Sequence, residues 1–260
     1  IIFKKNMKSI KNFYNDDGWK NTSNNSKDAE LFEDLRLSAK KYVSKCRLRI
    51  LKHIPKNGGS NILDFASGPI QYNEYLKFSK NFKKRHCVDF SKIAIDKAKK
   101  KLGTKGKYYC KDFLKINFKK NYFDCVVSLH TIYHIHKSKQ AMTIKKLINI
   151  SKKDSPIIIV YSNPNTFINY IKKVFFIKRK IKKDKLYFFC HKNNWWQQFS
   201  DLADVKFYPW RSFSSQHQKL LIPGNKIGQL IFKLLFLLEE KLPSFFVKFF
   251  QYQIIVLKKK

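Results

Sequence analysis

Apolar residues between positions 61 and 163 gather into five short runs, and helical patterns fill most of the gaps between them. The runs are NILDFA (61–66), RHCVDF (85–90), KYYCKDF (107–113), FDCVVSLH (123–130) and PIIIVYSN (156–163). Short, nearly continuous apolar runs are typical of strands that are buried on both faces. Their alternation with helices predicts an α/β protein built on a parallel sheet that helices cover on both sides.

Apolar residues three and four positions apart predict the helices. The clearest one begins after Ser91, a good N-cap residue, and ends at Gly103, a typical C-terminal glycine. A longer apolar stripe over 30–54 ends at the break KNGGS (56–60). Further helices are predicted over 70–80, 138–152, 192–203 and 226–242.

The pattern changes after Asn163. Residues 165–190 are basic and aromatic, and strands follow only at 203–210 and 251–259. A long insertion separates these two late strands, and we expect it to form a cap over the active edge of the sheet. The motif SNPN (162–165) follows the fifth strand, and its composition favours a plain turn.

Small and acidic residues stand where three successive strands end, at the edge where open parallel sheets bind ligands. The first strand ends in Asp64, followed by Ala66, Ser67 and Gly68, which let backbone approach a ligand closely; a G-x-G-x-x-G motif is absent. About 20 residues further on, Asp89 stands where a carboxylate accepts from two ribose hydroxyls.

Two further features extend this pattern. Phe90 is suited to lie against an adenine ring, and Asp112, before Phe113, can accept from an exocyclic amine. Singly, each acid is more typical of a helix cap or a surface charge. In order, at three successive strand ends, they indicate a nucleotide-like cofactor.

The phrases DFASG, VDFS and KDFLKINFKKNYFDCVVSLH together resemble class I S-adenosylmethionine-dependent methyltransferases of the small-molecule type. The resemblance covers residues 61–163 well, and 30–60 and the last two strands weakly. It implies a Rossmann-like, doubly wound sheet of seven strands with the last antiparallel. It also implies a lid and helix over 1–60, a cofactor-binding core over 61–163, and cap insertions with the last two strands over 164–260. The family's first loop is usually D/E-x-G-x-G-x-G, and Ala66 and Ile70 replace its outer glycines here.

The resemblance also assigns roles to particular residues. Asp64, Ala66 and Gly68 line the methionine part of S-adenosylmethionine, and Asp64 helps to hold its amino group. The remaining cofactor contacts are Asp89 with Phe90 at the ribose and adenine, Asp112 with the Phe113 backbone at the adenine, and Leu129 beside the sulfonium. Tyr14 and Trp19 belong to an N-terminal segment that folds over the cofactor in similar enzymes, and they either line the pocket or anchor the terminus.

Histidines cluster after the fourth strand in LHTIYHIHK (129–137), which gives the acceptor-side candidates His130, Tyr133 and His134. His130 is the candidate general base for a hydroxyl acceptor, although a structural role is more common for a histidine in this position. His134 either caps or packs. No third ligand accompanies the spacing of His130 and His134, so no metal is expected.

The net charge of +37 comes almost entirely from lysine. Because Lys, Asn, Ile and Phe are abundant together, codon bias of an AT-rich genome is the first explanation, ahead of attraction to nucleic acid or an anionic membrane. The five cysteines show no disulfide or zinc spacing and indicate a reducing cytoplasm. The N-terminus lacks a signal-peptide h-region, and no stretch is apolar enough for a membrane span.

The sequence therefore predicts a cytoplasmic methyltransferase that uses S-adenosylmethionine. Its expected acceptor is a small molecule, a sugar or a lipid-linked intermediate, with peripheral contact to the membrane left open. An RNA methyltransferase that uses the basic surface, and a non-catalytic binding protein on the same fold, are the alternatives.

Overall fold

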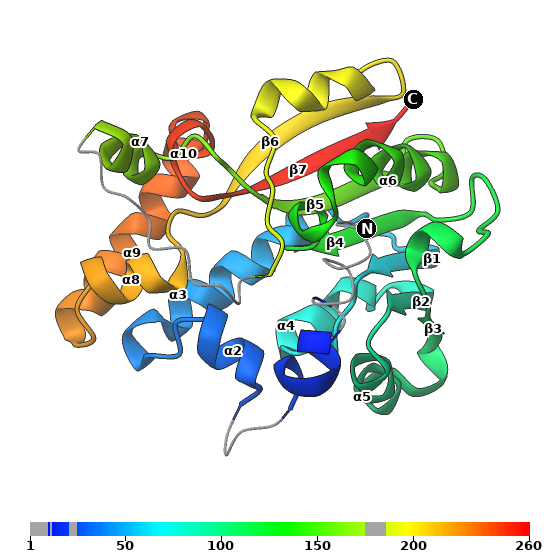
Figure 1. Ribbon diagram of the computed structural model, residues 1–260, viewed down its shortest axis with the longest axis horizontal. Helices are drawn as coiled ribbons and strands as arrows, with labels where there is room; N and C mark the ends of the chain where they lie inside the picture. The colour runs from blue at the N-terminus through cyan, green and yellow to red at the C-terminus, as the bar shows by residue number, and fades with distance from the viewer. Residues whose placement is uncertain (1–9, 11, 21–24, 175–185) are drawn as a thin grey trace.

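All strands lie in one twisted sheet, seen nearly face-on in the computed structural model of the protein (Figure 1). The structure describes residues 10, 12–20, 25–174 and 186–260. The strand order is β3-β2-β1-β4-β5-β7-β6. The first five strands run parallel, whereas β7 is antiparallel to both β5 and β6. The predicted Rossmann-like sheet of seven strands with an antiparallel last strand is confirmed.

The elements agree with the sequence pattern at most positions. The strands are β1 (Gly59–Phe65), β2 (Phe82–Asp89), β3 (Gly106–Cys110), β4 (Cys125–Leu129), β5 (Pro156–Ser162), β6 (Ala203–Arg211) and β7 (Tyr252–Lys259). The α-helices are α2 (Lys27–Phe32), α3 (Leu37–Leu48), α4 (Asn73–Leu76), α5 (Lys92–Leu102), α6 (Lys137–Ile150), α7 (Phe167–Val174), α8 (Ser215–Leu221), α9 (Lys226–Lys241) and α10 (Pro243–Phe249). Ser91 caps α5 as predicted, since its Oγ accepts from the N–H of Ala94 at 3.3 Å.

Alternate residues of the central strands enter two separate cores, one on each face of the sheet. In β5, Ile157 and Ile159 pack with Ile144 and Leu147 of α6, whereas Ile158 and Val160 face a cluster that contains Ile50 and Phe78. A smaller cluster joins α5 to the loop after β1. Burial on both faces explains why these strands are apolar throughout.

The single helix predicted over 30–54 is wrong, because the chain breaks between α2 and α3. The carboxylate of Asp34 accepts from the backbone N–H of Arg36 at 3.2 Å and from its guanidinium, an Asx-type turn that competes with the helix. Two apolar residues of the predicted stripe, Phe32 and Leu35, are exposed as a result. The predicted helix over 192–203 is instead a 3₁₀ segment, Asn193–Phe199.

The insertion between β6 and β7 folds into α8, α9 and α10. These helices lie beyond the edge where the parallel strands end, and α9 packs along α3 (Figure 1). Residues 175–185 of the basic, aromatic segment 165–190 fall outside the described residues.

Candidate cofactor and acceptor site

The loop after β1 has the backbone of a glycine-rich loop although it contains one glycine. Ala66, Gly68 and Ile70 have φ angles of +55°, +55° and +53°. These are the three positions at which the related motif carries glycine, and left-handed backbone is the conformation that glycine adopts most easily. The two replacements therefore change the side chains of the loop and leave its path.

Ile70 remains in this unfavourable conformation because its side chain is buried. It is inaccessible to solvent and packs with Cys87 of β2 and with Ile95 and Ala98 of α5. A left-handed L-residue costs roughly 1–2 kcal/mol. Burial of an isoleucine side chain contributes about 1.5–3 kcal/mol, which offsets that cost.

Asp89, at the end of β2, is tied to this loop by backbone hydrogen bonds. Its Oδ2 accepts from the N–H of Gly68 at 3.0 Å and its Oδ1 from the N–H of Ser91 at 2.8 Å. Burial raises the pKa of Asp89 to about 6, and the backbone donors oppose that rise. Each carboxylate oxygen has a second lone pair, so both can still accept from a diol. Phe90 follows, half-buried.

Asp64 is less free than the sequence suggests, because it forms a buried ion pair with Arg85 of β2. The Arg85 Nε lies 3.1 Å from Asp64 Oδ2, and another guanidinium nitrogen donates to the carbonyl of Tyr75 at 2.6 Å. This arginine fixes the carboxylate beneath the loop. Sequence reasoning missed it because the pair joins two different strands, 21 positions apart along the chain.

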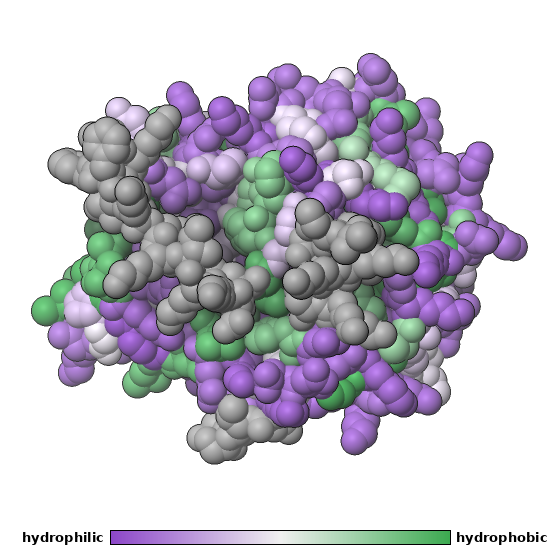
Figure 2. All heavy atoms as spheres, viewed as in Figure 1, coloured by the Kyte–Doolittle hydropathy of each residue, from purple (hydrophilic) through white to green (hydrophobic). Residues whose placement is uncertain are grey.

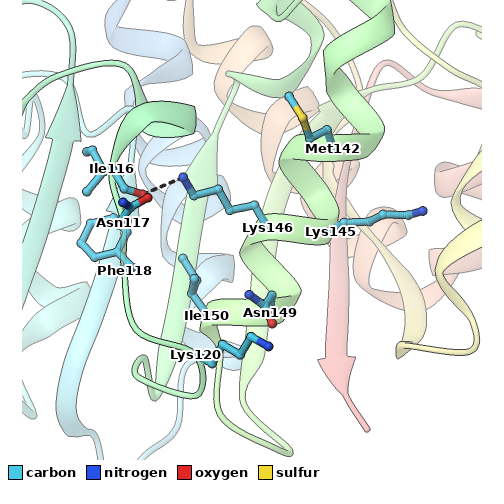
Figure 3. Close-up of a pocket in the computed structure, with 9 residues that line it drawn as sticks. All are labelled: Ile116, Asn117, Phe118, Lys120, Met142, Lys145, Lys146, Asn149 and Ile150. Atoms are coloured by element: carbon cyan, nitrogen blue, oxygen red, sulfur yellow. Dashed lines mark hydrogen bonds between the residues drawn. The ribbon is translucent and has the colours of Figure 1, made fainter.

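Asp112 and Phe113 form the next part of the same edge. Asp112 Oδ1 accepts from the N–H of Leu114 at 3.0 Å and so caps the short turn after β3, while the ring of Phe113 is buried against Phe65 at a centroid distance of 4.4 Å. Lys146 of α6 reaches across and donates to the carbonyls of Phe113, Leu114 and Ile116 at 2.7–3.0 Å. Figure 3 shows this lysine in a pocket of about 550 Å³ between α6 and residues 116–120. There it holds the turn that follows β3.

The N-terminal segment covers the loop after β1. Trp19 stacks on Tyr14 at 5.0 Å, and its ring carbons lie 3.2 Å from where a Cβ would stand on Gly68. Burial, together with the negative charges of Asp28 and Asp89, raises the pKa of Tyr14 well above its ordinary value. The two aromatic residues that the sequence named as a lid are thus beside the candidate cofactor loop.

His130 follows Leu129 of β4 and is held by an aromatic cage. It has a φ of +57°, its Nδ1 lies 2.8 Å from the hydroxyl of Tyr133, and its ring is 4.4 Å from that of Trp210. Its Nε2 is buried without a hydrogen-bond partner. Burial, and then the charge of Arg211, lowers the pKa of His130 well below its ordinary value, so the ring is neutral at pH 7.

Two arginines, Arg47 and Arg211, lie near His130. Arg211, at the end of β6, donates to Glu33 at 2.7 Å, and Arg47 of α3 lies 3.6 Å from the same carboxylate and stacks 3.3 Å from the ring of Tyr72. The Nε atoms of both arginines and the hydroxyl of Tyr72 are buried and unpaired. Sequence reasoning missed Arg47, whose only signal was arginine itself, a rare residue in this lysine-rich chain.

Other sequence candidates have structural partners. His134 Nδ1 lies 2.7 Å from the carbonyl of Tyr187, in agreement with the packing alternative. In SNPN, the amide of Asn163 donates to three carbonyls at the end of α10, at 3.0–3.1 Å, so this motif ties a turn to a helix. The cysteines are all free thiols, and in the described ranges no three His, Cys, Asp or Glu side chains gather as metal ligands.

The sheet order, the antiparallel last strand and the small-residue loop at the end of β1 define the class I methyltransferase fold. Residues 63–159 match the family described as a methyltransferase domain. This part of the chain is therefore similar to that family, and the chain as a whole has the fold of S-adenosylmethionine-dependent class I methyltransferases. No curated protein matches the chain.

Solved structures share the fold at low sequence identity. Magnesium protoporphyrin IX methyltransferase from Synechocystis PCC 6803 aligns with a TM-score of 0.62 and 12% identity, over 98% of this chain and 100% of its own. A SAM dependent methyltransferase from Archaeoglobus fulgidus gives 0.55 and 18%, over 84% and 94%. Phosphoethanolamine N-methyltransferase 2 from Haemonchus contortus gives 0.52 and 15%, over 83% of this chain and 52% of its own.

Proposed function

We propose that the protein transfers a methyl group from S-adenosylmethionine to an oxygen, nitrogen or carbon atom of a small-molecule, sugar or lipid-linked acceptor. The observation that carries this proposal is the loop after β1, which keeps positive φ at Ala66, Gly68 and Ile70 and is bound to Asp89 through the N–H of Gly68. A protein that had lost its cofactor would have no need for strained backbone at two non-glycine positions.

The cofactor would lie across the ends of β1, β2 and β4. Asp89 accepts from the ribose hydroxyls, Asp112 and the Phe113 backbone meet the adenine, and Ala66 and Gly68 line the methionine part. Asp64, held by Arg85, lies beneath that part of the loop. When bound, S-adenosylmethionine supplies an electrophilic methyl group. The protein aligns the acceptor for in-line displacement next to Leu129.

His130 can then hold the proton that a hydroxyl acceptor loses. Two tautomers are possible, and the Tyr133 contact selects between them. If Nδ1–H donates to the Tyr133 oxygen, Nε2 is free to accept the proton. If the Tyr133 hydroxyl donates to Nδ1, Nε2–H becomes a donor that positions the acceptor.

The buried groups around His130 favour an oxygen-rich acceptor. An arginine Nε–H can only donate a hydrogen bond, and both Arg47 and Arg211 have this group unpaired, beside the unpaired hydroxyl of Tyr72. Their missing partners are therefore acceptor atoms, as a sugar, a carboxylate or a phosphate provides. The structural neighbours include a porphyrin methyltransferase and a phosphoethanolamine methyltransferase, so the fold itself leaves the choice open.

An RNA methyltransferase remains the second candidate, and the net charge of +37 is the observation that favours it. Binding to RNA should weaken steeply as salt is raised, because phosphate contacts release counterions. Turnover on a small acceptor should change little over the same range.

The first test is calorimetric titration with S-adenosylmethionine. We expect wild-type protein to bind it and Asp89→Ala to bind about 100-fold more weakly, since two charge-assisted hydrogen bonds to the ribose are lost. Asp96→Ala is the matched control, because Asp96 is exposed on α5 and forms a surface ion pair with Lys92. A folded wild type that does not bind the cofactor would favour the non-catalytic alternative.

The second test concerns the acceptor side. Radiolabelled cofactor can be screened against sugars, nucleotide sugars and lipid-linked sugars. On an accepted hydroxyl substrate, His130→Asn should lower kcat by about 100-fold or more while cofactor affinity stays constant. His136→Asn is the control, because the His136 ring contacts Ser138 and Tyr187 at the start of α6.

A further inference from the structure

Helix α9 is apolar on two opposite faces, and only one of them is covered. Phe232, Leu235 and Phe236 pack on Tyr42, Val43 and other residues of α3. The other face carries a stripe at helical spacing that is exposed to solvent: Ile227, Leu230, Ile231, Leu234, Leu237 and Leu238. Helices that are apolar all round are normally buried completely, so the exposed stripe requires an explanation.

The stripe continues onto both neighbouring helices. Leu220 and Leu221 at the end of α8, Leu242 after α9 and Phe245 in α10 are also exposed, with Leu220 at 79% and Leu230 at 66%. Ten of the nineteen large apolar side chains that are exposed in the described residues therefore fall between positions 220 and 245. Figure 2 shows hydrophobic side chains among polar ones at the left of this face, over α8 and α9. We call these ten residues the cap patch. Soluble monomers rarely leave so many exposed together without a partner.

The charges around the cap patch are positive. Five lysines between positions 219 and 248 are exposed: Lys219, Lys226, Lys233, Lys241 and Lys248. The two acidic residues of this segment, Glu239 and Glu240, are paired with side chains outside it. Glu239 is buried against Tyr42 and Arg49, and Glu240 pairs with Arg49 and Lys52.

The apolar side chains and the surrounding lysines together discriminate between possible binding partners of the cap patch. A second copy of the chain would cover the leucines, but it would bring a second set of lysines against the first. Nucleic acid would complement the lysines and leave the leucines in water. An anionic bilayer complements both, since acyl chains take up the apolar stripe and lipid phosphates surround the lysines.

We propose that the cap patch docks the protein onto the surface of an anionic lipid bilayer. Over the residues that the structure describes, no helix has the length and apolar character needed to cross a membrane, so α9 would lie in the interface parallel to its plane. The cap patch belongs to the helices beyond the carboxyl edge of the sheet, which places the bilayer near the acceptor side. The docking stands independently of methyl transfer.

Vesicle co-sedimentation tests this proposal with a triple variant, Leu230→Ser with Leu234→Ser and Leu237→Ser. All three side chains are exposed, so the substitutions should leave the fold intact, which circular dichroism and thermal melting verify. Met142→Ser with Leu202→Ser is the control, because these residues are similarly exposed but lie in α6 and before β6. The vesicles are phosphatidylcholine alone, or phosphatidylcholine with a third of the lipid replaced by phosphatidylglycerol.

We expect the wild type and the control to sediment with the anionic vesicles and the triple variant to bind at least about tenfold more weakly. Equal binding by the triple variant would overturn the proposal, because lysines alone would then hold the protein. Failure of the wild type to bind at low salt would also overturn it, as would a wild-type dimer in light scattering that the triple variant dissociates. Cofactor titration of the triple variant separates this result from the proposed methyl transfer.

Discussion

The cofactor side and the cap side of the molecule both hold a carboxylate in place, but by different means. Asp89 is held by two backbone N–H groups, one in the loop after β1 and one at the start of α5. Glu239 of α9 is held by side chains, the Tyr42 hydroxyl at 2.6 Å and the Arg49 guanidinium at 2.7 Å, together with the N–H of Ser212 at 3.0 Å. The first arrangement follows from the local path of the chain. The second exists only when three distant segments have already packed.

This difference predicts where a single substitution does most damage. Glu239→Ala leaves the buried Arg49 and Tyr42 without their shared partner. If Asp89 is replaced, by contrast, water can satisfy the backbone N–H groups that held it. For Glu239→Ala we expect the free energy of unfolding, measured by urea denaturation, to fall by about 3–5 kcal/mol. Glu240→Ala removes an exposed partner of the same arginine and should cost about 1 kcal/mol or less. Equal losses in the two variants would show that Glu239 is not what fastens the cap.

The same contrast explains what the sequence could predict. Strand ends and the turns after them are local, so the sequence predicted the strands to within a few residues. It therefore also placed the candidates Asp64, Gly68, Asp89 and Asp112 at or just after the ends of successive strands. Partners across the cap side are separated by 178 positions in the pair Glu33–Arg211 and by 197 in the pair Tyr42–Glu239. No local pattern marks such pairs. The break at Asp34 was missed for the opposite reason, because one side-chain turn overrode an otherwise regular apolar stripe.

On the cofactor side, we expect the affinity for S-adenosylmethionine to depend on pH. Burial raises the pKa of Asp89 to about 6, and a protonated carboxyl cannot accept from both ribose hydroxyls. Affinity for S-adenosylmethionine should therefore fall about tenfold between pH 7 and pH 5, because only about a tenth of the carboxyl is ionised one unit below its pKa. Calorimetry across this range measures it.

The stability of the free protein should respond with the opposite sign. The folded pKa lies above the unfolded value of 3.8, so the folded state binds the proton more tightly and this group stabilises the fold as pH falls through 6. Asp89→Asn should remove both trends. Asp28→Asn controls for a second carboxyl, near Tyr14, whose pKa burial raises to about 7. A pH dependence of affinity that persists in Asp89→Asn and vanishes in Asp28→Asn would assign the effect to the lid side.

The smallest expected effect is a difference in stability between variants of the two residues that replace glycine in the loop, Ala66 and Ile70. Ala66 and Ile70 have nearly the same φ, but Ala66 has only a methyl group to lose, whereas Ile70 fills the space between β2 and α5. Ala66→Gly should relieve strain and raise the free energy of unfolding by up to about 1 kcal/mol, while Ile70→Gly should lower it by about 2 kcal/mol or more despite the same relief. Thermal melting of both variants measures the difference. If Ala66→Gly instead destabilised the protein, packing of the Ala66 methyl group would be what holds the left-handed backbone at this position. Side-chain contacts would then determine the path of the loop, as they do on the cap side.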